Sequence, residues 1–140
     1  RLAREEGVAI LITTHYLSEA EHCDRLALMY AGRIVAEGTP AHLKKQVERD
    51  IGQLVEMVVD KPGIALAHVV AAGFAGAALF GTKIHVLSRD PGRDEGRLRD
   101  VLARSGIAVG SVRTRMLSLE DVFVSRVMAL EQAAQKEVSA

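Results

Sequence analysis

An uninterrupted apolar run, residues 8–12, stands directly before Thr13, Thr14 and His15. Because this run shows no alternation of apolar and polar positions, both faces of the segment should be buried, as in a central strand of a parallel sheet. We therefore predict a strand over residues 8–13. Ligands bind at the carboxyl ends of strands in such sheets, which makes His15 a candidate site residue.

Two helices flank this strand in the predicted order of elements. Residues 1–7 are interpreted as the end of a helix, with Gly7 as its left-handed stop. After the strand, Ser18 and Glu21 match the S-x-x-E pattern of a capping box and predict a helix over residues 18–22.

The next two apolar segments predict a hairpin and a helix. Residues 25–30 and 33–37 are short strand patterns separated by Ala31 and Gly32, and glycine tolerates the positive φ of a tight turn. Thr39 is then a suitable N-cap and Pro40 a suitable first helical residue, so a helix should run from Pro40 to about Glu48.

After a polar joint at residues 48–52, the pattern restarts as a second unit. It predicts a strand over residues 54–59, a helix over 64–72, a hairpin of 77–80 with 83–87, a helix over 97–105 after a polar loop at 88–95, and a strand over 107–113. The order β-α-β-β-α-β is that of a ferredoxin-like unit, and right-handed crossovers would place both helices on one face of its sheet.

A final helix should begin at Ser118, which forms a looser capping pair with Asp121. Its apolar stripe includes Val122, Phe123 and Val127, and we expect this stripe to close the second unit by packing on the sheet.

The segment from Thr13 to Glu21 resembles the histidine switch loop in the ATP-binding subunits of ABC transporters. The resemblance continues in order and at matching spacing through residues 23–29 and 32–40, which are similar to the strand, hairpin and Thr-Pro turn that follow this loop in the family. Residues 118–123 resemble the segment that closes the accessory C-terminal domain of drug-export and antibiotic-resistance ABC ATPases. One departure is His42, which replaces the acidic residue usual after the Thr-Pro turn.

The resemblance implies a catalytic and nucleotide-binding role for His15, which would contact the γ-phosphate of ATP and link it to the attacking water. It implies ATP and Mg²⁺ as cofactors of the complete protein, a second ATP-binding subunit and membrane-spanning permease subunits as partners, and a cytoplasmic location at the inner face of the cell membrane. A hydrogen-bonding imidazole suits phosphoryl transfer, which is catalysed mostly by positioning and charge stabilisation.

The chain contains no G-x-x-x-x-G-K-[ST] phosphate loop, and the family's signature motif and acidic pair are also missing. In the family these motifs lie upstream of the histidine loop. We therefore expect the chain to be a C-terminal part of a longer ATPase that powers export of a drug-like or other small substrate, and to be inactive by itself.

The combined expectation is an α/β chain in three parts. Residues 1–49 would be the C-terminal remnant of a RecA-like P-loop ATPase sheet, residues 52–130 a ferredoxin-like accessory domain with its closing helix, and residues 131–140 a polar tail. The alternative that stays open is a non-catalytic regulatory or dimerisation module with a ferredoxin-like fold.

Composition narrows the function classes only slightly. Lys plus Arg equals Asp plus Glu at 18 each, so no net charge favours nucleic acid, and the predicted central strands lack the aromatics of an RNA-recognition surface. The single cysteine, Cys23, excludes an internal disulfide. His22 and Cys23 could suggest a metal site, but there is no second pair at ligand spacing, so we interpret His22 as a surface residue next to a buried thiol. Residues 64–81 reach the length of a membrane span but are rich in Ala and Gly, which disfavours that interpretation. We interpret His42, His68 and His85 as ordinary surface residues.

Overall fold

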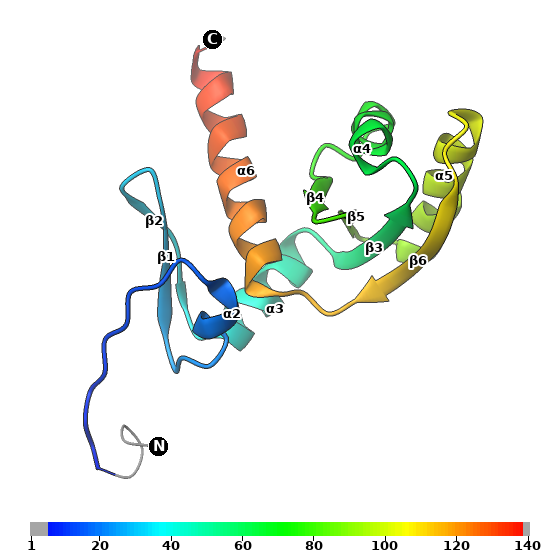
Figure 1. Cartoon of the computed structure of the whole chain (residues 1–140). Helices are drawn as coiled ribbons and strands as arrows, with labels where there is room; N and C mark the ends of the chain where they lie inside the picture. Colours follow the sequence, from blue (N-terminus) through cyan, green and yellow to red (C-terminus); the bar gives the residue numbers. More distant parts are fainter. Residues whose placement is uncertain (1–5, 139–140) are drawn as a thin grey trace.

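A computed structural model describes residues 6–138 of the chain (Figure 1). Within that part the chain forms a two-stranded and a four-stranded antiparallel sheet together with helices. The prediction of a mixed α/β chain is confirmed. Of the expected N-terminal helix, Arg1 to Glu5 lie outside the described residues, and Gly7 has the positive φ of 66° that we expected for a helix stop.

The prediction of a buried strand over residues 8–13 is wrong for this chain. These residues form no regular element and their side chains are exposed, with Leu11 97% exposed and Ile12 62% exposed. A central strand is held by hydrogen bonds to neighbours on both sides and by layers that cover its two faces. Among residues 6–138 no strand pairs with this segment, so its apolar side chains stay in solvent.

The first described helix is the short α2 (Leu17–Ala20). The predicted capping box is wrong, because Ser18 lies inside the helix and Tyr16 occupies the N-cap position without a side-chain bond. Thr14 forms the hydrogen bonds before this helix instead of Ser18. Its hydroxyl accepts the Tyr16 N–H at 3.0 Å and donates to the Glu19 carboxylate at 2.7 Å. This turn orders the backbone around His15.

The predicted hairpin and the helix after it are confirmed. Strands β1 (Leu26–Tyr30) and β2 (Arg33–Gly38) pair antiparallel. Ala31 and Gly32 form the turn with φ of 48° and 74°, the left-handed pair that a two-residue hairpin needs. Helix α3 (Pro40–Asp50) begins as expected, since the Thr39 side chain accepts the His42 N–H at 3.1 Å.

The second unit follows the predicted order of elements. These elements are β3 (Gln53–Val59), α4 (Pro62–Ala71), β4 (Ala78–Phe80), β5 (Lys83–Ser88), α5 (Pro91–Arg104) and β6 (Val109–Arg115). The strands lie in the order β4-β5-β3-β6, and every neighbouring pair is antiparallel. Gly52 permits the entry into β3, because its φ is 131° and a Cβ there would lie 2.2 Å from the Ser88 carbonyl oxygen.

Helix α5 begins six residues earlier than predicted, at Pro91 instead of Arg97. The segment that we expected as a polar loop carries its own start signal: Asp90 is the N-cap, its side chain accepts the Arg93 N–H at 3.2 Å, and Pro91 follows it. The first turns of α5 are polar because they are largely exposed. Their polar composition is also typical of a loop, which is why the sequence did not predict a helix there.

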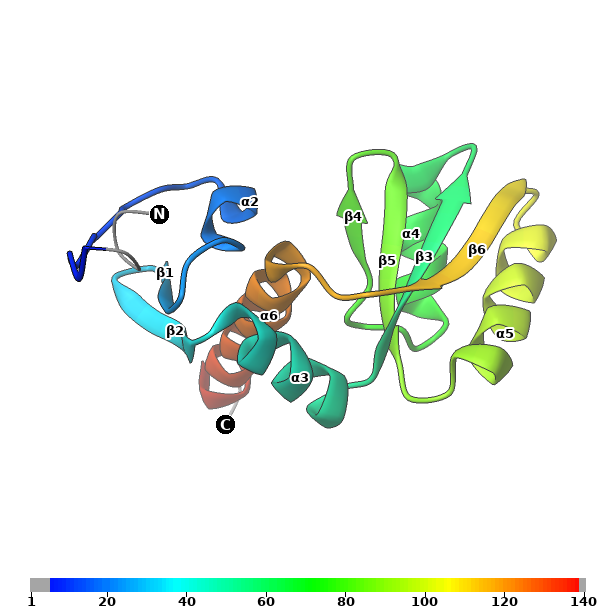
Figure 2. The ribbon, with the colours of Figure 1, turned by 90° about the horizontal axis from the view of Figure 1, so that it is seen from below.

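The main hydrophobic core lies between the four-stranded sheet and helices α4 and α5, which cover one face of it (Figure 2). Alternation along the strands sends Val55 and Met57 of β3 and Ile84 of β5 into this core, where they meet Val69 and Leu102 of the helices. The same alternation turns Leu54, Glu56, Lys83 and His85 to the opposite, open face of the sheet.

The C-terminal helix α6 (Leu119–Val138) lies beside α3, between the hairpin and the four-stranded sheet (Figure 2). The expectation that its stripe packs on the sheet holds only in part, because Val122 shares a second cluster with Leu54 of β3. That cluster also contains Leu28 of β1 and Leu43 of α3, and Phe123 packs against it. The second unit buries one face of its sheet under α4 and α5, whereas α2, α3 and the hairpin need an apolar cover that α6 supplies. The helix also runs through residues 131–138, which we had assigned to a polar tail.

The stretch 64–81 is divided between α4, a turn and β4. Among residues 6–138 there is no helix with the length and apolar character that crossing a membrane requires.

Candidate functional site

His15, the residue predicted from the sequence to act on ATP, is exposed at the loop between the extended segment and α2. Its ring lies against the neighbouring Tyr16 ring, with centroids 4.1 Å apart and planes tilted by 37°. The Thr14 turn orders the backbone on the C-terminal side of His15. Because the side chain is exposed, it is accessible to a ligand.

No group of three or more His, Cys, Asp or Glu side chains that could hold a metal ion occurs in the part of the chain that the structure describes. His22, His42 and His68 are exposed, in agreement with the sequence-based expectation, whereas Cys23 is only partly buried.

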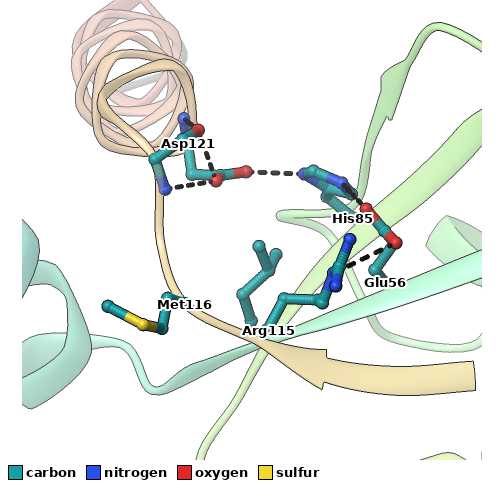
Figure 3. Close-up of a pocket in the computed structure, with 7 residues that line it drawn as sticks. Glu56, His85, Arg115, Met116 and Asp121 are labelled. Atoms are coloured by element: carbon teal, nitrogen blue, oxygen red, sulfur yellow. Dashed lines mark hydrogen bonds and ion pairs between the residues drawn. The ribbon is translucent and has the colours of Figure 1, made fainter. Parts of the chain in front are cut away.

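The interpretation of His85 as an ordinary surface residue is wrong. It lies on the open face of β5, its side chain is only 13% exposed, and it sits between two carboxylates (Figure 3). The imidazole Nδ1 is 2.6 Å from Asp121 Oδ1 in the first turn of α6, and Nε2 is 3.2 Å from Glu56 Oε2 on β3. The Phe80 ring of β4 stacks on the imidazole at 4.3 Å.

The two carboxylates are held by further donors. Asp121 Oδ2 accepts the Ser118 N–H at 2.8 Å and the Ser118 hydroxyl at 2.7 Å, which confirms the predicted capping pair at the start of α6. Glu56 Oε1 is 3.1 Å from Lys83 Nζ and 3.4 Å from Arg115 Nε. Each of the four carboxylate oxygens thus lies within 3.2 Å of a donor group.

These contacts shift the protonation equilibria of all three groups. Burial lowers the pKa of His85, but the hydrogen bonds and charges of Asp121 and Glu56 outweigh it, and the pKa is raised above its ordinary 6.5. Burial raises the pKa of Asp121, yet the hydrogen bonds from His85 and Ser118 hold it below its ordinary value. Burial also raises the pKa of Glu56. The interactions with Lys83, His85 and Arg115 outweigh this effect and bring the pKa below its ordinary value.

A cavity of about 380 Å³ lies beside this cluster. Glu56, His85 and Asp121 form its polar side, and Leu54 and Met116 form its apolar wall. A second groove of about 620 Å³ runs between α3 and the link from β6 to α6, and Glu21, Lys44 and Arg115 are among its lining residues. His15 lines neither of them.

Glu21 links the segment after His15 to the start of α6. Its Oε1 accepts the Leu119 N–H at 3.0 Å, and its Oε2 is 2.5 Å from Lys44 Nζ on α3. Two residues of the first turn of α6 are therefore bonded to other parts of the chain, Leu119 to Glu21 and Asp121 to His85.

The His85 cluster could not be recognised from the sequence. His85 and Asp121 are 36 positions apart and His85 and Glu56 are 29 apart, and only the capping pair marked Asp121 as a residue of interest. The pairing of β3 with β5 was needed to set His85 opposite Glu56 on the same face of the sheet.

Comparison with known proteins adds sequence relatives, while no family model matches the chain. The chain is 50% identical over 46 residues to the probable multidrug ABC transporter ATP-binding protein YbhF of Escherichia coli, covering 33% of this chain. It is 32% identical over 126 residues to the Nod factor export ATP-binding protein I of Rhizobium sp. strain N33, covering 89% of this chain. The energy-coupling factor transporter ATP-binding protein EcfA1 of Caldanaerobacter subterraneus is 36% identical over 62 residues, or 43% of this chain.

The chain spans only part of each of these relatives. The matched region is 8% of YbhF, 38% of the Nod factor export protein and 22% of EcfA1. The match to the Nod factor export protein extends over both the hairpin region and the four-stranded sheet, because it covers nine-tenths of the chain.

Proposed function

Because the chain is a homologue of ABC transporter ATP-binding proteins, we propose that it works as part of such an ATPase and contributes to ATP-driven transport. The observation that carries the proposal is the similarity over 126 residues to a transport ATP-binding protein, which spans nearly the whole chain. The phosphate loop would come from a segment other than these 140 residues, whose sequence contains none.

We assign His15 the role of contacting the γ-phosphate of ATP and orienting the attacking water. Its exposure at a locally ordered turn supports this role, since a ligand held by other parts of the ATPase can approach the imidazole. When bound, Mg²⁺ would neutralise charge on the phosphates, and His15 would supply a hydrogen bond to the transferred group.

The exposed apolar segment 8–12 supports the same arrangement. A run of this kind is stable when it is a central strand covered on both faces, and such a strand would set His15 at the carboxyl edge of a sheet, where ligands bind. We propose that the strand predicted over residues 8–13 forms when the nucleotide-binding sheet is complete.

Residues 53–115 would form a ferredoxin-like accessory domain. The strand order β4-β5-β3-β6, the antiparallel pairing and the placement of α4 and α5 on one face support this assignment. The partners would be a second ATP-binding subunit and permease subunits, at the inner face of the membrane, and the transported compound a small exported molecule. The name of one relative specifies multidrug transport and that of another Nod factor export.

A chimera tests the role of His15. The matched region of the Nod factor export protein is replaced by this chain, and ATP binding and hydrolysis are measured separately. We expect the chimera to hydrolyse ATP and His15→Ala to lower kcat by roughly 10²-fold, the order for losing one donor to transition-state charge, with ATP affinity nearly unchanged. His42→Ala, another exposed histidine, is the control and should retain activity.

The isolated 140-residue chain gives the complementary measurement. We expect neither tight ATP binding nor hydrolysis, since its sequence lacks the phosphate loop. Turnover by the isolated chain would contradict the proposal, and full turnover by the His15→Ala chimera would remove His15 from the site.

A further inference from the structure

The four-stranded sheet meets the first turn of α6 through one apolar and one polar contact. Leu54, with support from Leu87, joins Leu119 and Val122 in the second hydrophobic cluster. The polar contact is the bond between His85 of the sheet and Asp121 of α6, with the Asp121 side chain 3% exposed. Since α6 packs otherwise on α2, α3 and the hairpin, this junction joins the sheet to the helix that packs on the N-terminal elements.

The polar half of the junction depends on the number of protons on His85. Both ring nitrogens face carboxylate oxygens, and ionised carboxylates only accept hydrogen bonds. Glu56 is kept ionised by Lys83 and Arg115, and Asp121 by the donors of Ser118. A neutral imidazole has a single N–H, so one ring nitrogen would direct a lone pair at a carboxylate.

We propose that His85, Glu56 and Asp121 form a protonation-controlled latch that holds the open face of the sheet against the first turn of α6. With two N–H groups the imidazolium bridges β3 and α6. After loss of a proton the bridge keeps one hydrogen bond and gains one repulsive contact, and the sheet separates from α6 more often. This device does not depend on the proposed transport function.

The charged groups around the latch come from every strand and helix near it. Lys83 precedes His85 on its own strand, Arg113 and Arg115 lie on β6 opposite β3, and Phe80 of β4 adds an uncharged ring. Lys83 and Arg115 form ion pairs with Glu56, and Asp121 and Glu56 favour the charged form of His85. The carboxylates prevail because their oxygens lie within hydrogen-bond distance of both ring nitrogens.

The pKa shifts of His85, Glu56 and Asp121 determine how the stability of the latch depends on pH. The pKa of His85 is raised in the folded chain, so its stabilising effect is complete below about 6.5 and is lost as pH rises through the folded value. The pKa values of Glu56 and Asp121 are lowered, so their effect is complete above their ordinary 4.5 and 3.8 and is lost in stronger acid. The latch is therefore tightest in the mildly acidic range and loosens toward alkaline pH.

The position of the latch gives it a route to the loop that carries His15. Asp121 lies in the same turn as Leu119, whose N–H is held by Glu21, directly after α2. Movement of the first turn of α6 would therefore reach the segment after His15 through one hydrogen bond.

Hydrogen exchange of the whole 140-residue chain tests the latch. The opening ratio of the Asp121 and Val122 amides, corrected for intrinsic exchange, is measured between pH 6 and pH 8.5. We expect an increase of about tenfold in the wild-type chain, the order for losing a hydrogen bond to a charged group. His85→Gln should abolish this pH dependence, whereas His68→Gln, at an exposed position on α4, should retain it.

An NMR titration of the His85 ring keeps the test decisive if His85→Gln does not fold. We expect the ring to titrate above 6.5 and the Asp121 amide shift to follow the same curve. A His85 ring that titrates at its ordinary value, an Asp121 amide that ignores it, or an opening ratio independent of pH in the wild-type chain would each overturn the proposal.

Discussion

At the scale of single residues, Glu21 shows how one carboxylate joins three elements. It follows α2, pairs with Lys44 of α3 and accepts the first N–H of α6. A helix leaves its first N–H groups without partners inside the helix, and Ser118 and Asp121 bond with each other's backbone and side-chain groups. Glu21 therefore completes the N-terminal cap of α6 from 98 positions away.

Glu21→Ala should lower the free energy of unfolding by about 1–2 kcal/mol, the range for losing a helix cap or a hydrogen bond to a charged group. Lys44→Met is the matched control, because it removes the ion pair and leaves the bond to Leu119 in place. Urea unfolding of the two variants measures the difference. Equal losses would assign the effect to the ion pair instead of the cap.

At the scale of elements, α6 brings the C-terminal part of the chain into contact with the N-terminal hairpin and α3. Phe123 packs edge-on against Tyr30 of β1, with ring centroids 6.3 Å apart, and the Tyr30 hydroxyl donates to Glu131 at 2.7 Å. These contacts place α6 on the hairpin and α3, although its stripe alone is equally suited to a sheet surface.

Phe123→Ala should destabilise the hairpin and α3 more than the four-stranded sheet. Emptying a fully buried phenylalanine site costs about 3–5 kcal/mol, and half-burial reduces the expected loss to about 2 kcal/mol. Hydrogen exchange should show reduced protection in α3 and β1, with α4 and α5 little changed. Leu79→Ala, at an exposed position of β4, is the control. Loss of protection confined to the sheet would contradict the docking of α6 described here.

At the scale of the whole molecule, the apolar segment 8–12 stands apart from both hydrophobic clusters. Exposed neighbouring apolar side chains of this kind favour association with other surfaces. We expect them to contribute little to the stability of the folded body, because they belong to neither of its hydrophobic clusters.

The double variant Leu11→Asp and Ile12→Asp should leave the stability of the chain within about 0.5 kcal/mol of the wild type, as is usual for surface substitutions. It should also reduce self-association at high protein concentration. Thermal unfolding and sedimentation velocity measure the two effects. A clear loss of stability would show that the segment packs on the folded body.

The sequence by itself determined the elements whose signals are local. Thr39 and Pro40 start α3 through a cap and a fixed φ, and Ala31 and Gly32 turn the hairpin. Such signals act over a few residues and need no partner elsewhere. They could be read correctly even though the total fold was unknown.

Only the tertiary structure decided where α6 docks, what surrounds His85 and whether residues 8–13 form a strand. An apolar stripe indicates that a helix packs on a partner but does not identify that partner. Phe123 packs on Tyr30 of the hairpin instead of the sheet. The environment of His85 required strand pairing with Glu56 and a helix end that brings Asp121 from 36 positions away. A buried strand, finally, is a property of its neighbours, because backbone hydrogen bonds and cover on both faces come from other segments.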